Sequence, residues 1–141
     1  MSHRPSDDEL RQLYAQTKTI AVVGASKSEE KAAHQIPRFL QEQGYTILPV
    51  TPSTDEVLGA PTVPALSQLE EAVDVVNVFR PAEEAPEIAR EAVALGAKAL
   101  WLQEGIVSEE AAMIARNGGL TVVMDACIKK NYIRLGMSEN S

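Results

Sequence analysis

The sequence has few of the residues that build cross-links, metal clusters or membrane spans. Cys127 is its single cysteine, which excludes an internal disulfide and a zinc cluster made of thiolates. Its long apolar runs, such as Ile20–Val23 and Val73–Phe79, have the length of strands, far below the roughly 18 residues that cross a bilayer. The first residues include no hydrophobic segment of the kind that signal peptides contain. We therefore expect a cytoplasmic protein that is not attached to a membrane.

An excess of positive charge is also missing. The formal net charge is -7 at pH 7. A general nucleic-acid binder needs a basic face, and an anionic membrane surface repels an acidic protein. The charge thus predicts neither nucleic acid nor a membrane as a partner.

What the chain does contain is an alternation of strand-like and helix-like segments. Apolar residues make up 45% of it, enough for the core of one domain over residues 1–141. We expect a helical extension over residues 1–17, a loop over 53–64 with a short edge strand at 62–63, a short helix from Ser67, and a frayed tail over 136–141. Five segments are expected to be strands: Thr19–Val23, Tyr45–Val50, Val73–Phe79, Ala99–Leu102 and Leu120–Met124.

The strand segments are nearly continuous apolar runs with little alternation. Such strands are buried on both faces, which is typical of parallel sheets covered by helices. The sequence therefore predicts an α/β fold with a single doubly wound, mainly parallel Rossmann-type sheet and helices on both faces. In these sheets ligands bind beyond the carboxyl ends of the strands.

The first of these strand ends continues as Gly24-Ala25-Ser26-Lys27. Glycine permits a tight turn and a close approach of the backbone to a ligand. Ser26 offers a hydroxyl, Lys27 a positive charge, and the following helix start directs N–H groups outward. This turn is typical of a site for a phosphate or diphosphate.

The second strand end argues against NAD. A dinucleotide-binding enzyme has an acidic residue there, which holds the ribose hydroxyls. This chain has Val50, Thr51 and Pro52, with no carboxylate until Asp55, and the loop after the first strand has only one glycine of the Gly-x-Gly-x-x-Gly motif. An NAD(P)-binding redox subunit therefore remains only as an alternative.

Two further strand ends supply polar groups. Phe79, Arg80 and Pro81 follow the third strand, and Arg80 either binds a phosphate or pairs with a carboxylate such as Glu83 or Glu84. The fourth strand ends in Gln103 and Glu104, which offer hydrogen-bonding groups, after a Trp101 that we assign to the core.

Cys127 follows the fifth strand. We interpret it as a buried structural thiol, with thiol exchange with a thiol-bearing ligand as the alternative.

Taken in order, the strand ends resemble the CoA-binding domain family, the Rossmann-type module also found at the N-terminus of the succinyl-CoA synthetase alpha subunit. The resemblance is closest to the small stand-alone members and extends from about Thr19 to Leu135. Members usually have Asn where Thr51 stands, and often a basic residue at Ser53. The matching features are Val-Gly-Ala-Ser at 23–26, Gly-Tyr at 44–45, Leu-Pro-Val at 48–50 with Pro52, Val-Leu-Gly at 57–59, residues 73–80, Trp-Leu-Gln at 101–103 with Gly105, and Val-Met-Asp at 123–125 with Cys127.

The resemblance implies that coenzyme A lies across the strand ends. It places the diphosphate at Gly24, Ala25 and Ser26, the adenosine at Val50, Thr51 and Pro52, a further wall at Phe79, Arg80 and Pro81, and the pantetheine towards Gln103 and Glu104. The missing acidic residue fits this ligand, because CoA carries a phosphate on the ribose hydroxyl that NAD leaves free.

The resulting hypothesis is a module that binds CoA or an acyl-CoA and has a regulatory or carrier role, without catalysis of its own. The synthetase relies on a phosphorylated histidine of a further domain and on a partner subunit. The other alternative is a regulatory or scaffolding domain that has lost its ligand. A homodimer and an unidentified protein partner both remain open.

Overall fold

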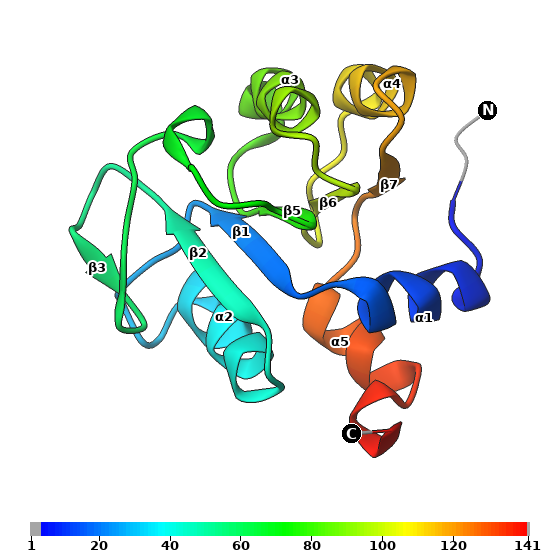
Figure 1. The fold of residues 1–141 in the computed structure, drawn as a ribbon, viewed down its shortest axis with the longest axis horizontal. Coiled ribbons are helices and arrows are strands. Elements are labelled where there is room, and N and C mark those ends of the chain that lie inside the picture. The colour runs from blue at the N-terminus through cyan, green and yellow to red at the C-terminus, as the bar shows by residue number, and fades with distance from the viewer. Residues whose placement is uncertain (1–3, 141) are drawn as a thin grey trace.

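The computed structural model describes residues 4–140. Five parallel strands form the central sheet, in the order β2-β1-β5-β6-β7 (Figure 1). Their bounds are β1 Thr19–Val23, β2 Thr46–Val50, β5 Val75–Val78, β6 Ala99–Leu102 and β7 Thr121–Val123. The expected doubly wound parallel sheet is confirmed.

Helices cover both faces of this sheet. Helices α3 (Ala85–Leu95) and α4 (Glu109–Asn117) lie on one face, and α1 (Asp7–Gln16), α2 (Ala32–Glu42) and α5 (Ile128–Arg134) lie on the other (Figure 1). Each face has its own apolar cluster, because successive side chains of the strands point to opposite sides. All residues of β5 and β6 are buried, as the continuous apolar runs predicted.

The predicted helical extension is anchored to the domain rather than projecting from it. Ser6 and Glu9 form the expected capping box at the start of α1. Leu10 and Tyr14 are buried, and the Tyr14 hydroxyl donates a hydrogen bond of 2.6 Å to the carbonyl of Ile128 in α5. Residues 1–3 of this extension, and residue 141 of the predicted tail, lie outside the described residues.

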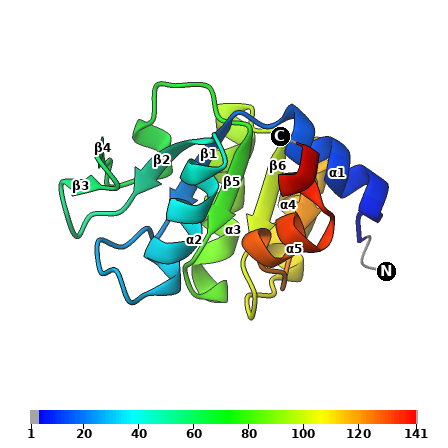
Figure 2. The same ribbon diagram turned by 90° about the horizontal axis from the view of Figure 1, so that it is seen from below.

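Three local features differ from the sequence-based expectations. The segment predicted as a loop contains a small antiparallel hairpin of β3 (Glu56–Val57) and β4 (Ala60–Pro61), and Val63 forms a single bridge to Val50 beside β2 (Figure 2). The helix expected from Ser67 is one 3-10 turn, Leu66–Gln68. Residues Met137–Asn140, expected to fray, form another.

The strand order explains where a ligand can bind. From β1 the chain crosses to β2 at the edge and then returns to β5 on the other side of β1. The connections therefore leave the ends of β1 and β5 in opposite directions, which opens a crevice at the carboxyl end of the sheet. No helix among residues 4–140 combines the length and apolar character needed to cross a membrane.

Asp74 links the start of β5 to the start of β1 at the opposite end of the sheet, and its replacement tests how much this link stabilises the fold. Its carboxylate accepts hydrogen bonds from the N–H groups of Lys18 (2.8 Å) and Thr19 (3.1 Å) and lies 3.5 Å from Lys98 Nζ. Partial burial alone would raise the pKa of Asp74, but these donors outweigh it and hold the pKa below its ordinary value.

We predict that Asp74→Asn lowers the free energy of unfolding at pH 7 by about 1–2 kcal/mol, because the N–H groups of Lys18 and Thr19 then donate to a neutral amide oxygen and the ion pair with Lys98 is lost. Since the folded-state pKa is depressed, this stabilisation is complete above the unfolded pKa and disappears as the pH falls through the folded value. Urea unfolding of the wild type and of Asp74→Asn at pH 7 and pH 3 measures the difference in their free energies of unfolding. The exposed Asp55→Asn is the matched control, and equal effects of the two variants at pH 7 would contradict the prediction.

Candidate functional site

The ends of β1, β2 and β5 meet at a groove of about 560 Å³. This volume lies within the roughly 300–1,000 Å³ of small-molecule sites. Residues from all three strand ends line it, with α3 as the opposite wall. The predicted site residues among them are Gly24, Ala25, Ser26, Val50, Thr51, Pro52 and Arg80.

Gly24 makes the turn that begins this groove. Its φ is +92°, a left-handed backbone conformation that residues other than glycine rarely adopt. Its N–H donates to the carbonyl of Val50 at 2.8 Å, so the turn is fastened to the end of β2. A Cβ added here would lie 2.9 Å from Arg80 Cδ and 3.2 Å from the carbonyl oxygen of Phe79. The close packing of two strand ends therefore requires glycine.

Three hydrogen bonds hold Ser26, one within the following loop and two to the first turn of α2. Its N–H donates to the carbonyl of Ala33 (3.2 Å), its hydroxyl oxygen accepts from the N–H of Ser28 (3.0 Å), and its carbonyl lies 2.8 Å from His34 Nδ1. A carbonyl can only accept, so the buried His34 donates from Nδ1. The sequence did not assign this role to His34, whose place in the first turns of α2 was its only signal.

The start of α2 lies beside the same turn. Lys31 is the N-cap residue and makes no side-chain cap, and its side chain lines the groove. An uncapped helix start directs N–H groups and the positive end of the helix dipole towards an anion. Lys27, the cation named from the sequence, is exposed and is not among the groove-lining residues.

The second strand end contributes hydroxyl groups. Thr51 is buried, and its Oγ1 lies 2.9 Å from Ser53 Oγ and accepts from the N–H of Ser53 at 3.3 Å. Asp55 is not among the lining residues, so this turn brings no carboxylate into the groove.

The third strand end supplies Arg80, which pairs with Glu84. Arg80 Nε donates to Glu84 Oε1 at 3.1 Å, and Nη2 donates to Oε2 at 2.7 Å. This hydrogen bonding raises the pKa of Arg80 and lowers that of Glu84. Of the two roles left open for Arg80, the structure shows the carboxylate pair. The flanking Phe79 and Pro81 are not among the lining residues.

Carboxylates from α3 form a wall that the sequence did not predict. Glu84, Glu87 and Glu91 all line the groove. Glu87 pairs with Arg90 at 3.1 Å, and Glu91 Oε1 accepts from the N–H of Ser67 at 3.2 Å. Their spacing along one helix was the available signal, but it did not show which face of the helix meets the strand ends.

The fourth strand end is separate from this groove. Gln103 is buried, and its Oε1 accepts from the N–H of Ile128 (3.2 Å) and from Asn77 Nδ2 (3.4 Å). Glu104 points to the surface and pairs with Lys130 at 2.9 Å. Trp101 and Cys127 are both buried, and Cys127 Sγ accepts from the N–H of Lys130 at 3.5 Å.

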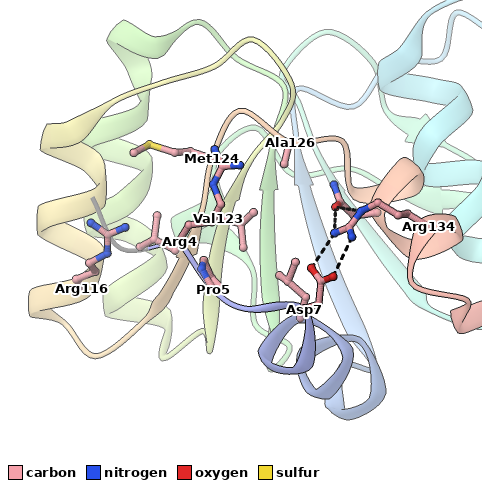
Figure 3. Close-up of a pocket in the computed structure, with 11 residues that line it drawn as sticks. Arg4, Pro5, Asp7, Arg116, Val123, Met124, Ala126 and Arg134 are labelled. Carbon is pink, nitrogen blue, oxygen red and sulfur yellow. Dashed lines mark hydrogen bonds and ion pairs between the residues drawn. The ribbon is translucent and has the colours of Figure 1, made fainter. Parts of the chain in front are cut away.

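A second cavity lies at the far edge of the sheet, between β7, α1 and α5. It measures about 190 Å³ and includes none of the predicted site residues. Arg4 and Arg116 line it together with Arg134, which is already bound to Asp7 and Asn131 (Figure 3). It is smaller than the roughly 300 Å³ at which small-molecule sites begin, so the groove is the better candidate for a nucleotide.

Known proteins resemble the chain along most of its length. It is 40% identical to the uncharacterized protein YneT of Bacillus subtilis (strain 168), over 89% of this chain and 93% of that protein. It is 31% identical to the ADP-forming acetate–CoA ligase II of Archaeoglobus fulgidus over 72% of this chain, but the match spans only 15% of that ligase.

Two solved structures share the fold closely. The structure of cell-free ID.343 from Thermus thermophilus has a TM-score of 0.89 and 41% identity, covering 93% of this chain and 99% of that one. A hypothetical protein from Pyrococcus horikoshii OT3 has a TM-score of 0.90 and 32% identity, covering 96% and 98%. The CoA binding domain family matches residues 18–133, which include every strand of the central sheet. The chain therefore belongs to the CoA binding domain family.

Proposed function

We propose that the groove binds coenzyme A or an acyl-CoA, and that the protein is a cytoplasmic carrier or regulatory module that does not catalyse a reaction alone. The observation that carries this proposal is the left-handed turn at Gly24, which lines the groove beside the uncapped start of α2, where a helix N-terminus favours an anion. Membership of the family and the likeness to a ligase that is named for CoA support it.

In this proposal the diphosphate lies at Gly24, Ala25 and Ser26, with Lys27 and Lys31 nearby. The adenosine lies against Val50, Thr51 and Pro52. The segment Phe79–Arg80–Pro81 forms the next wall, and the pantetheine extends towards Gln103 and Glu104. The absence of a carboxylate from the turn after β2 leaves space for the 3′-phosphate.

Electrostatics decide what kind of contact must hold the ligand. CoA is strongly negative and the protein has a formal net charge of -7, so long-range attraction does not contribute. Charges farther away than about 8 Å are screened at physiological ionic strength. Binding therefore depends on local groups. These are the N–H groups of the loop and of the helix start, the Ser26 hydroxyl, and the groove-lining cations Lys31 and Arg80.

Calorimetric titration tests the ligand class. We expect CoA and acetyl-CoA to bind more tightly than NAD, since NAD gains no acidic partner for its ribose after β2. Tighter binding of NAD would favour the redox alternative. If the folded protein binds none of the three, and Gly24→Glu and Arg80→Glu leave partner capture unchanged, the ligand-free scaffolding alternative is favoured.

The Gly24 turn can be tested against a glycine of similar conformation. Gly24→Ala and Gly44→Ala both place a side chain at positive φ (+92° and +105°), which costs about 1–2 kcal/mol of stability in each case. Only at Gly24 does the new Cβ meet Arg80, because Gly44 has no neighbouring atom within 4 Å.

We predict that Gly24→Ala weakens CoA binding by roughly tenfold, the equivalent of about 1.4 kcal/mol, while Gly44→Ala leaves the affinity unchanged. Titration calorimetry measures the affinities and thermal unfolding confirms that both variants are folded. An unchanged affinity in Gly24→Ala would remove the turn from the binding site.

A further inference from the structure

Arg80 is fixed beside the Gly24 turn by the packing of its own stem. A Cβ on Gly24 would lie 2.9 Å from Arg80 Cδ and 3.3 Å from Cγ, so the aliphatic part of the side chain rests directly on the turn. The stem thus holds the guanidinium over the groove. If the diphosphate lies at this turn, as proposed above, Arg80 is its nearest guanidinium among the groove-lining residues.

Glu84 occupies the hydrogen-bonding edge of that guanidinium. Two parallel bonds join the pair, at 3.1 and 2.7 Å. Arginine binds phosphate through the same two-pronged geometry. Both side chains are nearly half exposed (47% and 46%), and ion pairs this exposed are weak. A phosphate can therefore replace the Glu84 carboxylate without a large loss.

The position of Glu84 gives the displaced carboxylate a second favourable place. Glu84 is the N-cap residue of α3, and its side chain makes no capping hydrogen bond while it is paired with Arg80. A carboxylate at a helix N-terminus interacts favourably with the positive end of the helix dipole, even where, as here, the Ala85 N–H is bonded to Ala82 and Pro86 has no N–H. Release from Arg80 therefore does not leave Glu84 without a compensating interaction.

The other carboxylates of the wall do not share this freedom to exchange. Glu87 is paired with Arg90, and Glu91 accepts from the N–H of Ser67. Neither contacts Arg80 in a hydrogen bond or ion pair within residues 4–140. Glu84 is thus the residue whose charge competes directly with an incoming anion.

We propose that Glu84 is an internal competitor for Arg80 and sets how strongly an anion must bind Arg80 to enter this part of the groove. This inference rests on the proposed function and identifies the residue that weakens anion binding at Arg80. A ligand that offers one carboxylate replaces Glu84 with an equivalent group and gains nothing. A phosphate or diphosphate offers more negative charge and more acceptor oxygens, so the exchange favours it.

The test compares Glu84→Gln with Glu83→Gln. Glu83 is the exposed neighbouring residue, and the two variants change the net charge equally. The probes are CoA, inorganic pyrophosphate and acetate, titrated calorimetrically. We expect Glu84→Gln to tighten binding of CoA and pyrophosphate by about two- to fivefold, in line with the strength of an exposed ion pair, and to tighten binding of acetate by the same factor where acetate reaches Arg80. Glu83→Gln should leave all three unchanged.

Arg80→Gln completes a double-mutant cycle. If Glu84 acts through Arg80, the gain from Glu84→Gln disappears when Arg80 is also replaced. A gain that persists without Arg80, or that is equal in Glu83→Gln, would show general charge repulsion and overturn the inference. Thermal unfolding of each variant shows that the protein remains folded.

The outcomes separate this inference from the proposed function. If the wild type binds CoA and Glu84→Gln does not change the affinity, the inference is wrong and the function stands. If pyrophosphate binds with the expected dependence on Glu84 but CoA does not bind, the inference stands and the function is wrong. If no probe binds any variant, both are wrong.

Discussion

Two main-chain hydrogen bonds beyond the end of β1 determine the geometry of the groove. The N–H of Gly24 donates to Val50 and the N–H of Phe79 donates to Val23, each at 2.8 Å. Together they continue the parallel ladder past the strands and fasten the ends of β2, β1 and β5 at one level. After this bond the backbone of β1 turns away from the sheet, and the positive φ of Gly24 allows that turn. The groove is thus a consequence of where the sheet stops.

The loop after Gly24 is arranged so that its acceptors are used internally. The Ser26 carbonyl accepts a hydrogen bond from His34 Nδ1, and the Ser26 N–H donates to the carbonyl of Ala33, so both partners belong to the first turn of α2. A carbonyl that faced the groove would repel an anion, so binding it to a buried histidine removes an unfavourable contact. The Ser26 side chain and the start of α2 are left to line the groove. Local hydrogen bonding between the loop and α2, rather than net charge, prepares this side of the groove.

The sequence predicted the sheet, its parallel direction and the Gly24 turn, because burial on both faces and strand-ending glycines leave a direct pattern in the residues. It did not predict the pairing of Arg80 with Glu84, since either a phosphate or a carboxylate satisfies an arginine at a strand end. Nor did it show that Gln103 turns inward to Ile128 N–H: the side-chain direction after the last strand residue depends on where α5 begins. The β3–β4 hairpin was missed because its strands have two residues each, too few to show an alternation.

Three carboxylates at the start of α3 and along it give the groove one negatively charged wall. The turn after β2 lacks an acidic residue, which argues against NAD and fits the phosphorylated ribose of CoA that the family resemblance implies. In the folded protein, Glu84, Glu87 and Glu91 face the same groove from α3, against the two cations Lys31 and Arg80. A phosphate is therefore stabilised beside the turn and the start of α2, and repelled beside α3. In the proposed function, an anionic ligand therefore lies across the groove with its charge on the β1–α2 side and its least charged part against α3. Because the two walls differ in charge, we expect them to fix the orientation of the ligand that we propose for the groove.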